Sequence, residues 1–259
     1  MMDEYALITG AGKGIGKSMA LQLAQKGYNL LLVSRSENDL QALSSRLTTE
    51  YQIKVEYLAI DLSNMGAALS VFNWANTLAV PVSILVNNAG HGLWGDFDIL
   101  DITAQTAMMQ VNMNALVELS YHFIPLLKQQ NQAYILNTAS TAAYQAVPTL
   151  AIYSATKAFV LSFSRALRYE LKDTPIAVSC LCPGPTDTGF AHSAGMDALA
   201  ELAAKFNMAA DDVARIGLNG MLNKKAEIVP GFLNKLSAAA ARHSPKAFIE
   251  RVTAGLYKR

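Results

Sequence analysis

Two side chains suited to proton transfer, Tyr153 and Lys157, lie four residues apart in a stretch with helical periodicity, 151–173. This spacing places both on one helix face, where the ammonium can lie near the phenol. A tyrosine with its ordinary pKa of ~10 is a poor base at neutral pH, but a neighbouring cation favours the phenolate. The pair predicts an acid/base centre. The alternative is a helix-face aromatic, because Tyr-x-x-x-Lys also arises by chance.

A glycine-rich turn near the N-terminus is the second feature with chemical potential. It follows an expected strand and opens an expected helix, and it reads Gly10-Ala11-Gly12-Lys13-Gly14-Ile15-Gly16. Backbone N–H groups at such a helix end attract anions, and glycine lets a phosphate approach the backbone. The turn therefore indicates dinucleotide binding, although its spacing differs from the commoner Gly-x-Gly-x-x-Gly fingerprint. A plain tight turn is the alternative.

The same turn resembles a nucleoside-triphosphate P-loop. Ala11-x-x-x-x-Gly16-Lys17-Ser18 nearly matches that motif, and Asp61 after an apolar run could imitate the Mg²⁺-binding acid. The strict motif has glycine where Ala11 stands. A P-loop NTPase is therefore kept only as an alternative.

The end of the second expected strand indicates which dinucleotide binds. A carboxylate there suits the ribose 2′-hydroxyl of NAD, whereas a cation suits the 2′-phosphate of NADP. The strand ends in Ser34 and Arg35, no acid occurs before Glu37, and Lys13 lies in the glycine turn. The two cations favour NADP(H). The alternative for each is a solvated surface side chain.

These residues need a scaffold, and the order of apolar runs predicts one. Short runs that are apolar at consecutive positions, as in strands buried on both faces, alternate with helical stretches. This order predicts an α/β, Rossmann-like fold, a doubly wound parallel sheet with helices on both faces. Strands are expected at 5–9, 29–34, 55–60, 84–87, 134–138 and 176–182, with 226–229 as an edge strand. Helices are expected near 15–27, 36–50, 64–79, 104–130, 151–173 and 209–223.

Nothing in the 259 residues marks a domain boundary, since repeats, low-complexity tracts and linkers are absent from the sequence. We therefore expect one domain over 1–259. The stretch 187–208 interrupts the rhythm just after a strand's carboxyl end and is an expected substrate lid. An ordinary pair of surface helices is the alternative.

Composition narrows the classes of partner. Lys and Arg number 21 against 20 Asp and Glu, without a block of like charges, so no footprint for nucleic acid or an anionic membrane is expected. No apolar run approaches the ~18 residues of a membrane span, and the N-terminus lacks secretory-signal features. Cys180 and Cys182 share one strand face and are expected to be buried, reduced thiols of a cytoplasmic protein. The scattered histidines predict no metal site.

Four motifs together resemble those of the short-chain dehydrogenase/reductase family, in its single-domain form. They are Thr9 with the glycine turn, Asn87-Asn88-Ala89-Gly90, Tyr153-Ser154-Ala155-Thr156-Lys157, and Pro183-Gly184-Pro185-Thr186-Asp187-Thr188. Each alone is weak, but their order and separations are specific. The resemblance covers about residues 5 to 190, and we recognise no substrate signature beyond.

The resemblance implies roles for residues along one edge of the sheet. Asp61, with Leu62, would lie near the adenine amino group, and Thr188 would bond the nicotinamide carboxamide. With the two cations inferred above, the expected cofactor-binding residues are Gly10, Gly12, Lys13, Gly14, Ile15, Gly16, Arg35, Asp61, Leu62, Asn88, Ala89, Gly90, Tyr153, Lys157, Pro183, Gly184, Thr186 and Thr188.

The resemblance also implies a catalytic set of Asn112, Ser140, Tyr153 and Lys157. Ser140, thirteen residues before Tyr153, would hold the substrate oxygen while the tyrosine donates a proton. Lys157 would also bind the nicotinamide ribose, and the main-chain carbonyl of Asn112 would hold a water in a proton relay. The alternatives are a strand-end cap for Ser140 and a polar surface residue for Asn112.

The predicted function is NADP(H)-dependent reduction of a ketone, aldehyde or 3-oxoacyl thioester to the alcohol. The alternative is a non-catalytic NADP(H)-binding regulatory protein, since a fold does not fix a function. The partner is a small carbonyl or alcohol substrate, and the resemblance implies a homodimer or homotetramer. Residues expected to shape an apolar pocket are His91, Leu93, Trp94, Tyr144 and Gln145.

Overall fold

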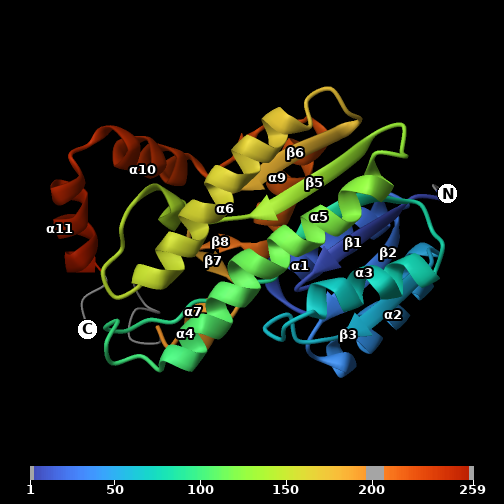
Figure 1. Cartoon of the computed structure of the whole chain (residues 1–259), viewed down its shortest axis with the longest axis horizontal. Coiled ribbons are helices and arrows are strands. Elements are labelled where there is room, and N and C mark those ends of the chain that lie inside the picture. Colours follow the sequence, from blue (N-terminus) through green and yellow to red (C-terminus); the bar gives the residue numbers. More distant parts are fainter. Residues whose placement is uncertain (1–2, 197–206, 257–259) are drawn as a thin grey trace.

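The structure is a computed structural model that describes residues 3–196 and 207–256 (Figure 1). Its main sheet has seven parallel strands in the order β3-β2-β1-β4-β5-β6-β9. The strands are β1 (Tyr5–Thr9), β2 (Asn29–Ser34), β3 (Val55–Ala59), β4 (Val82–Asn87), β5 (Ala133–Thr138), β6 (Ile176–Leu181) and β9 (Glu227–Ile228). The direction of winding reverses between β1 and β4, which confirms the predicted doubly wound α/β fold.

Helices cover both faces of the sheet, and alternate strand residues enter the two resulting cores. Ala6 and Ile8 pack with α1 (Gly14–Gln25), α2 (Glu37–Tyr51) and α9 (Ala210–Leu222). Leu7 points the other way, into the core under α3 (Ala67–Thr77), α5 (Ala115–Leu127) and α6 (Ala151–Glu170). Burial on both sides explains why these strands are apolar at consecutive positions.

The prediction that every strand is buried on both faces is wrong for β3. Glu56 and Ala59 are exposed there. This strand lies at the edge of the sheet with β2 as its one strand neighbour, so the covering helices shield it only in part. The expected helix at 104–130 is also interrupted, because α4 (Ile102–Met109) and α5 are joined by a π-helical turn, η1 (Gln110–Asn114).

Two helices follow β9 that the sequence pattern did not predict, α10 (Phe232–His243) and α11 (Lys246–Leu256). They lie at the left of the view in Figure 1, on the side toward which the arrow of β5 points. We refer to them together as the C-terminal arm.

The expected lid at 187–208 lies partly outside the described residues, which omit 197–206. The described part holds α7 (Phe190–Ser193) and a small second sheet that pairs β7 (Thr186–Asp187) with β8 (Met208–Ala209). A lid function and a single domain over 1–259 both stay predictions.

The two cysteines lie as predicted on one face of the strand. Cys180 and Cys182 are buried, free thiols with their sulfur atoms 3.8 Å apart. Within residues 3–196 and 207–256, no helix combines the length and apolar character needed to span a bilayer.

Candidate active site

The glycine turn packs so closely that side chains would not fit. A Cβ on Gly16 would lie 2.2 Å from the carbonyl oxygen of Gly10, and Gly10 itself has a φ of +67°. Helix α1 starts at Gly14 after Lys13, with no side-chain cap and no acid in its first turn. Its free N–H groups and positive helix end therefore remain open to an anion.

Hydrogen bonds join the turn to the carboxyl end of β4, across the point where the winding reverses. Thr9 Oγ1 accepts hydrogen bonds from the backbone N–H groups of Asn88 and Ala89, each at 3.0 Å. The Asn88 side chain donates to the Thr9 carbonyl at 3.1 Å. The predicted turns after β1 and β4 thus form one surface, at the switch point where doubly wound folds bind ligands.

At the end of β2, the buried hydroxyl of Ser34 is positioned to bind a ligand. Ser34 Oγ is buried without a hydrogen-bond partner among the described residues, and a Cβ on Gly12 would lie 3.1 Å from it. The neighbouring Arg35 is exposed, so its guanidinium is accessible to an anionic ligand. Lys13, also exposed, pairs at 3.6 Å with the carboxylate of Asp39, a contact that no motif in the sequence indicates.

Asp61 lies where the third strand ends, within the electrostatic field of Arg35. Burial acts to raise the pKa of the Asp61 carboxyl, but hydrogen bonds from Ser63 and the charge of Arg35 together lower it. The Ser63 backbone N–H donates to this carboxylate at 2.9 Å. Burial, reinforced by Arg35 and Lys157, lowers the pKa of His91 nearby, so that His91 favours its neutral form.

Three apolar residues among those predicted to bind the cofactor pack in the cores. Ile15 packs against the core under α1, and Leu62 and Ala89 belong to the opposite one. Their side chains fix the backbone of the adjoining turns.

Lys157 is a buried cation beside Tyr153, as the four-residue spacing predicts. Its residue is only 4% exposed, its Nζ lies 5.8 Å from the centre of the Tyr153 ring, and it donates to the Thr138 carbonyl at 3.0 Å. Burial lowers the pKa of Lys157 to about 8, and the thiols of Cys180 and Cys182 oppose this shift. The ammonium therefore titrates close to neutral pH.

Asn112 is 1% exposed in the π-turn η1, so the alternative of a polar surface residue is wrong. Its side chain accepts from the His91 N–H at 3.1 Å and donates to the His91 carbonyl at 3.0 Å and to Thr156 Oγ1 at 3.1 Å. A Cβ on Gly90 would lie 2.9 Å from Asn112 Oδ1 and 3.2 Å from Lys157 Nζ. Asn112 thus fixes the turn after β4 against α6.

Ser140 follows β5 and caps the short 3₁₀ helix η2 (Thr141–Tyr144). The alternative of a strand-end cap is therefore observed. The Oγ of Ser140 accepts from the Ala142 N–H at 3.1 Å. A hydroxyl that accepts one bond can still donate its proton to a ligand. Capping and substrate binding by Ser140 are therefore compatible.

Tyr144, expected to line the pocket, directs its hydroxyl to Glu227 instead, at 2.7 Å. Glu227 also binds Arg165 at 3.2 Å and Arg242 of α10, whose guanidinium lies 4.5 Å from the Tyr144 ring centre. Burial, together with Cys182 and Glu227, raises the pKa of Tyr144, which stays a neutral donor. No local sequence pattern indicates this cluster, because its members are far apart in the chain.

Apolar side chains surround Tyr153 on its other side. The Phe190 ring lies 5.4 Å from the Tyr153 ring, and a Cβ on Gly92 would lie 2.8 Å from Phe190. The buried members of this cluster are Trp94, Met108, Val147, Leu150 and Tyr153. A substrate at Tyr153 would therefore meet an apolar wall.

Thr186 and Thr188 return the chain from β6 to the glycine turn. Thr188 Oγ1 donates to the Thr186 carbonyl at 3.4 Å and accepts from the Phe190 N–H at 3.3 Å. A Cβ on Gly14 would lie 2.8 Å from the Thr188 Cβ. The fourth motif thus touches the first.

Pro183 and Gly184 join this segment to the rest of the site. The Pro183 carbonyl accepts from the Thr141 N–H at 2.8 Å, beside Ser140. A Cβ on Gly184 would lie 2.3 Å from Asn234 Oδ1 of α10. All four motifs therefore meet at the carboxyl edge of the sheet.

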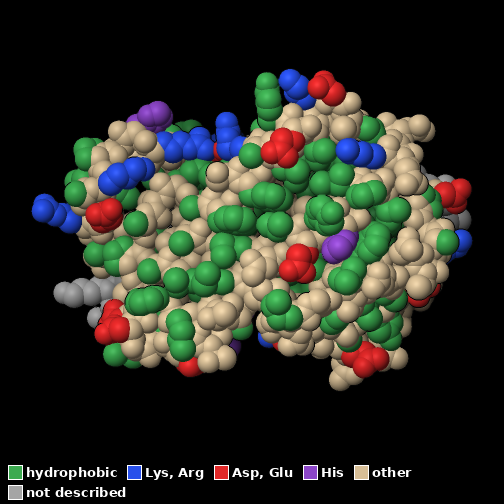
Figure 2. Space-filling model, in the orientation of Figure 1, with side chains coloured by type: hydrophobic (Ala, Val, Ile, Leu, Met, Phe, Trp, Pro, Cys, Tyr) green, Lys and Arg blue, Asp and Glu red, His purple; other side chains and the backbone are tan. Residues whose placement is uncertain are grey.

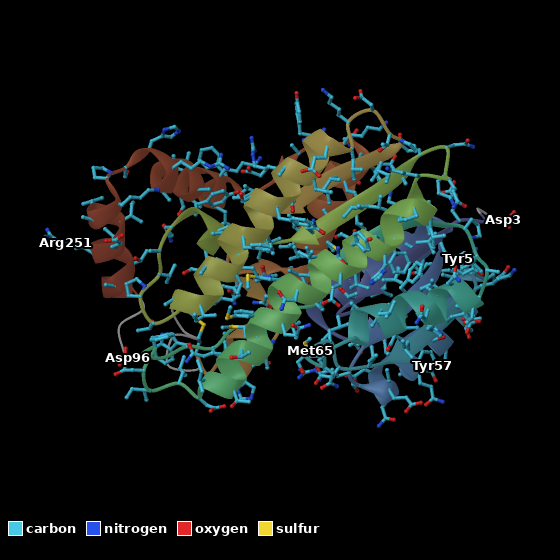
Figure 3. All side chains as sticks on the ribbon, in the orientation of Figure 1. Asp3, Tyr5, Tyr57, Met65, Asp96 and Arg251 are labelled. Carbon is cyan, nitrogen blue, oxygen red and sulfur yellow. The ribbon has the colours of Figure 1, made fainter. Side chains whose placement is uncertain are left out.

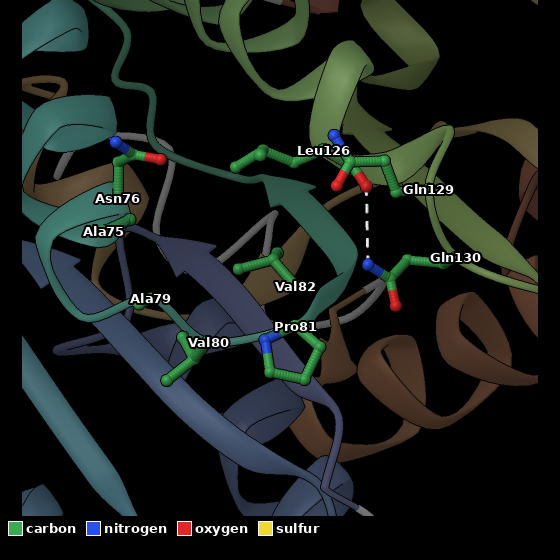
Figure 4. A pocket seen from close by; sticks show the side chains of 9 residues that line it. All are labelled: Ala75, Asn76, Ala79, Val80, Pro81, Val82, Leu126, Gln129 and Gln130. Atoms are coloured by element: carbon green, nitrogen blue, oxygen red, sulfur yellow. Dashed lines mark hydrogen bonds between the residues drawn. The ribbon is translucent and has the colours of Figure 1, made fainter.

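A pocket of about 320 Å³ lies at the opposite end of the sheet (Figure 4). It is formed by the ends of α3 and α5 and by the segment that leads into β4, where Gln130 donates to the Leu126 carbonyl at 3.4 Å. Its lining carries no charged side chain. We therefore assign the candidate site to the carboxyl edge.

The fold places this chain in the class of doubly wound α/β proteins that bind ligands at the carboxyl edge of the sheet. The model of the family described as short chain dehydrogenase matches residues 4–199. The chain therefore belongs to the short-chain dehydrogenase/reductase family, as its motifs predict. Membership leaves the P-loop interpretation without support, and the C-terminal arm lies beyond the matched residues.

Known proteins similar to this chain agree with the assignment. A very-long-chain 3-oxoacyl-CoA reductase of Pyrenophora tritici-repentis is 36% identical over 182 residues, which cover 68% of this chain and 53% of the relative. The chain spans a little over half the length of the first such reductases it matches.

Two solved structures resemble the whole described fold. A short-chain dehydrogenase from Sphingobium yanoikuyae in complex with NADPH has a TM-score of 0.82 and 29% identity, covering 94% of this chain and 97% of the other. A short-chain dehydrogenase/reductase from Burkholderia phymatum in complex with NAD has a TM-score of 0.82 and 25% identity, covering 92% and 94%.

Proposed function

We propose that this protein is an NADP(H)-dependent oxidoreductase that reduces a ketone, aldehyde or 3-oxoacyl thioester to the alcohol. The observation that carries the proposal is the buried ammonium of Lys157, held 5.8 Å from the ring centre of Tyr153 by its bond to the Thr138 carbonyl. Burying an ammonium group costs free energy, so its presence here indicates that the charge has a function. Similarity to a protein named very-long-chain 3-oxoacyl-CoA reductase supports reduction of a carbonyl group.

The residues of the carboxyl edge fit a dinucleotide. The uncapped start of α1 suits the pyrophosphate, and the unpartnered Ser34 hydroxyl suits the adenosine ribose or its phosphate. Asp61 and Leu62 would lie at the adenine, Lys157 at the second ribose, and Thr188 at the nicotinamide amide. When bound, the cofactor supplies or accepts the hydride.

Preference for NADP(H) is the finer part of this proposal. Exposed Arg35 next to Ser34 supports it, since a guanidinium binds phosphate with two parallel hydrogen bonds. Lys13 adds a second cation, although Asp39 shares its charge at 3.6 Å. The similar structures hold NADPH in one case and NAD in another, so the preference depends on these residues.

The chain's own groups then handle the proton. Tyr153 donates its phenolic proton to the carbonyl oxygen as that oxygen becomes an alkoxide, and Ser140 donates a hydrogen bond to the same oxygen. The Lys157 ammonium stabilises the phenolate that remains. Asn112 holds the turn that carries His91 against Thr156, and a water at its main-chain carbonyl would return the proton.

Replacing Tyr153 with Phe tests the mechanism. We expect turnover of NADPH with a panel of ketones, aldehydes and acyl thioesters, followed at the nicotinamide absorbance, to fall by at least ~10²-fold in Tyr153→Phe. NADPH affinity, measured by cofactor fluorescence, should change little. An active variant would refute the role of Tyr153, and a wild type that binds NADPH without turnover of any panel member would indicate the regulatory alternative. A homo-oligomer and a cytoplasmic location stay predictions.

A further inference from the structure

Helix α10 of the C-terminal arm turns its largest apolar side chains away from the protein. Phe232, Leu233 and Leu236 are 79%, 64% and 59% exposed. The residues that α10 buries are small, Ala238 and Ala241. At 100° per residue the three large side chains lie on the side of the helix opposite the two alanines.

Helix α11 continues this pattern. Phe248 and Val252, one turn apart, are both exposed, whereas Thr253 is buried, with its hydroxyl oxygen 3.2 Å from the Ala146 carbonyl and nearer still to carbonyls of its own helix. Soluble proteins rarely expose extended apolar surface, and where they do it marks an interaction site. Both helices of the arm therefore present apolar side chains that nothing in the described chain covers.

The arm also concentrates positive charge. From residue 230 to the end, the sequence holds six Lys and Arg residues and a single acid, Glu250. The whole chain carries a formal charge of only +1, so the residues before 230 are net negative. Figure 2 shows the Lys and Arg side chains over the arm, and Figure 3 shows Arg251 pointing outward from α11.

The arm is fixed to the protein body, which leaves defined cations free for a partner. Arg242 is held by Glu227 and by the Tyr144 ring, and it therefore belongs to the body. Lys235 on α10 and Lys246 and Arg251 on α11 make no ion pair within the described residues.

We propose that the C-terminal arm binds the surface of an anionic lipid bilayer. Amphipathic helices that carry Phe and Leu on one side and Lys and Arg beside them adsorb in the plane of such a surface. A second copy of this chain is a poorer occupant, because a two-fold contact would set Lys235, Lys246 and Arg251 of the arm against the same three cations. The proposal is independent of the proposed reaction.

This inference replaces the expectation of no membrane partner. That expectation depended on the balance of charge over the whole chain, which conceals the opposite signs of the body and the arm. Adsorption at the interface does not require a helix that spans the membrane.

Flotation with lipid vesicles tests the proposal. Vesicles are made from phosphatidylcholine alone or with phosphatidylglycerol as about a third of the lipid. We expect at least ~10-fold more wild-type protein on the anionic vesicles, and release in about 0.5 M NaCl, where the Debye length is short. Failure of the wild type to bind anionic vesicles would overturn the proposal.

Paired variants separate the contributions. Phe232→Ser with Leu236→Ser, and separately Lys246→Glu with Arg251→Glu, should each reduce binding by at least ~10-fold. Met65→Ser removes an equally exposed apolar side chain remote from the arm and should bind like the wild type. An equal loss of vesicle binding in Met65→Ser would overturn the proposal. It would also be overturned if the arm variants bound vesicles like the wild type and only converted an oligomer to a monomer in sedimentation. Unchanged far-UV circular dichroism verifies that each variant is folded.

Discussion

The buried ammonium of Lys157 predicts an unusual dependence of stability on pH. Burial lowers its pKa from the ordinary 10.5 to about 8 in the folded protein. Between these values the unfolded chain binds more protons than the folded protein, so the free energy of unfolding rises with pH. At about 1.4 kcal/mol for each pKa unit, the whole increment is about 3 kcal/mol. It is present above pH 10.5 and is lost as the pH falls through 8.

Comparison with Lys157→Met isolates this increment, because groups remote from Lys157 titrate alike in both proteins, and His91, whose lowered pKa Lys157 helps to set, is already mostly neutral at pH 7 and above. Methionine is apolar and of similar length, and the loss of the bond to the Thr138 carbonyl affects the variant equally at every pH. Urea unfolding without cofactor, at about pH 7 and about pH 9.5, should show the wild type gaining about 2 kcal/mol over the variant.

A difference between the two proteins that stays constant over this range would refute the reasoning, because it would mean that Lys157 keeps its ordinary pKa. The same titration bears on activity. The value of kcat/KM for carbonyl reduction, which reports the free enzyme, should decline above about pH 8 as the ammonium loses its proton.

Further predictions concern the two ends of the site. Arg35→Asp should lower the ratio of kcat/KM with NADPH to that with NADH by at least ~10-fold, and an unchanged ratio would contradict the cofactor preference. Glu227→Gln should lower the free energy of unfolding in urea by about 1–3 kcal/mol, more than Tyr144→Phe does, since it also weakens two ion pairs. Phe190→Ala, beside Tyr153, should raise kcat/KM for bulky ketones relative to small aldehydes by about 10-fold; equal changes for both would argue against Phe190 as a wall of the pocket.

Much of the sheet could be predicted because its signal is local. Strands such as Tyr5–Thr9 and Asn29–Ser34 are apolar at consecutive positions, and their predicted bounds match the observed ones. The π-turn η1 could not be predicted, since five residues barely disturb a helical period. Helices α10 and α11 were not predicted, because their large apolar residues face solvent, whereas those of a helix packed on a sheet face the core.

In the candidate site, too, contacts within one element could be predicted and contacts between elements could not. The i,i+4 spacing of Tyr153 and Lys157 forecasts their proximity, because it depends only on helix geometry. The carbonyl that holds Lys157 belongs to Thr138, and the carboxylate beside Lys13 belongs to Asp39. Such contacts form between separate elements and cannot be predicted from local spacing. The sequence therefore indicates the cation Lys13 but not the carboxylate that partly neutralises it.

The segment that carries Ser140 is held from two directions, and this links the reactive edge to the C-terminal arm. On the inner side, Lys157 binds the carbonyl of Thr138, two residues before Ser140. On the outer side, Glu227 joins Tyr144 to Arg242 of α10, and α11 contacts the Ala146 carbonyl. The family's matched residues end at 199, yet the outer contacts come from Glu227, Arg242 and α11, which lie beyond them. The position of the Ser140 hydroxyl therefore depends on a part of the chain that carries none of the four motifs.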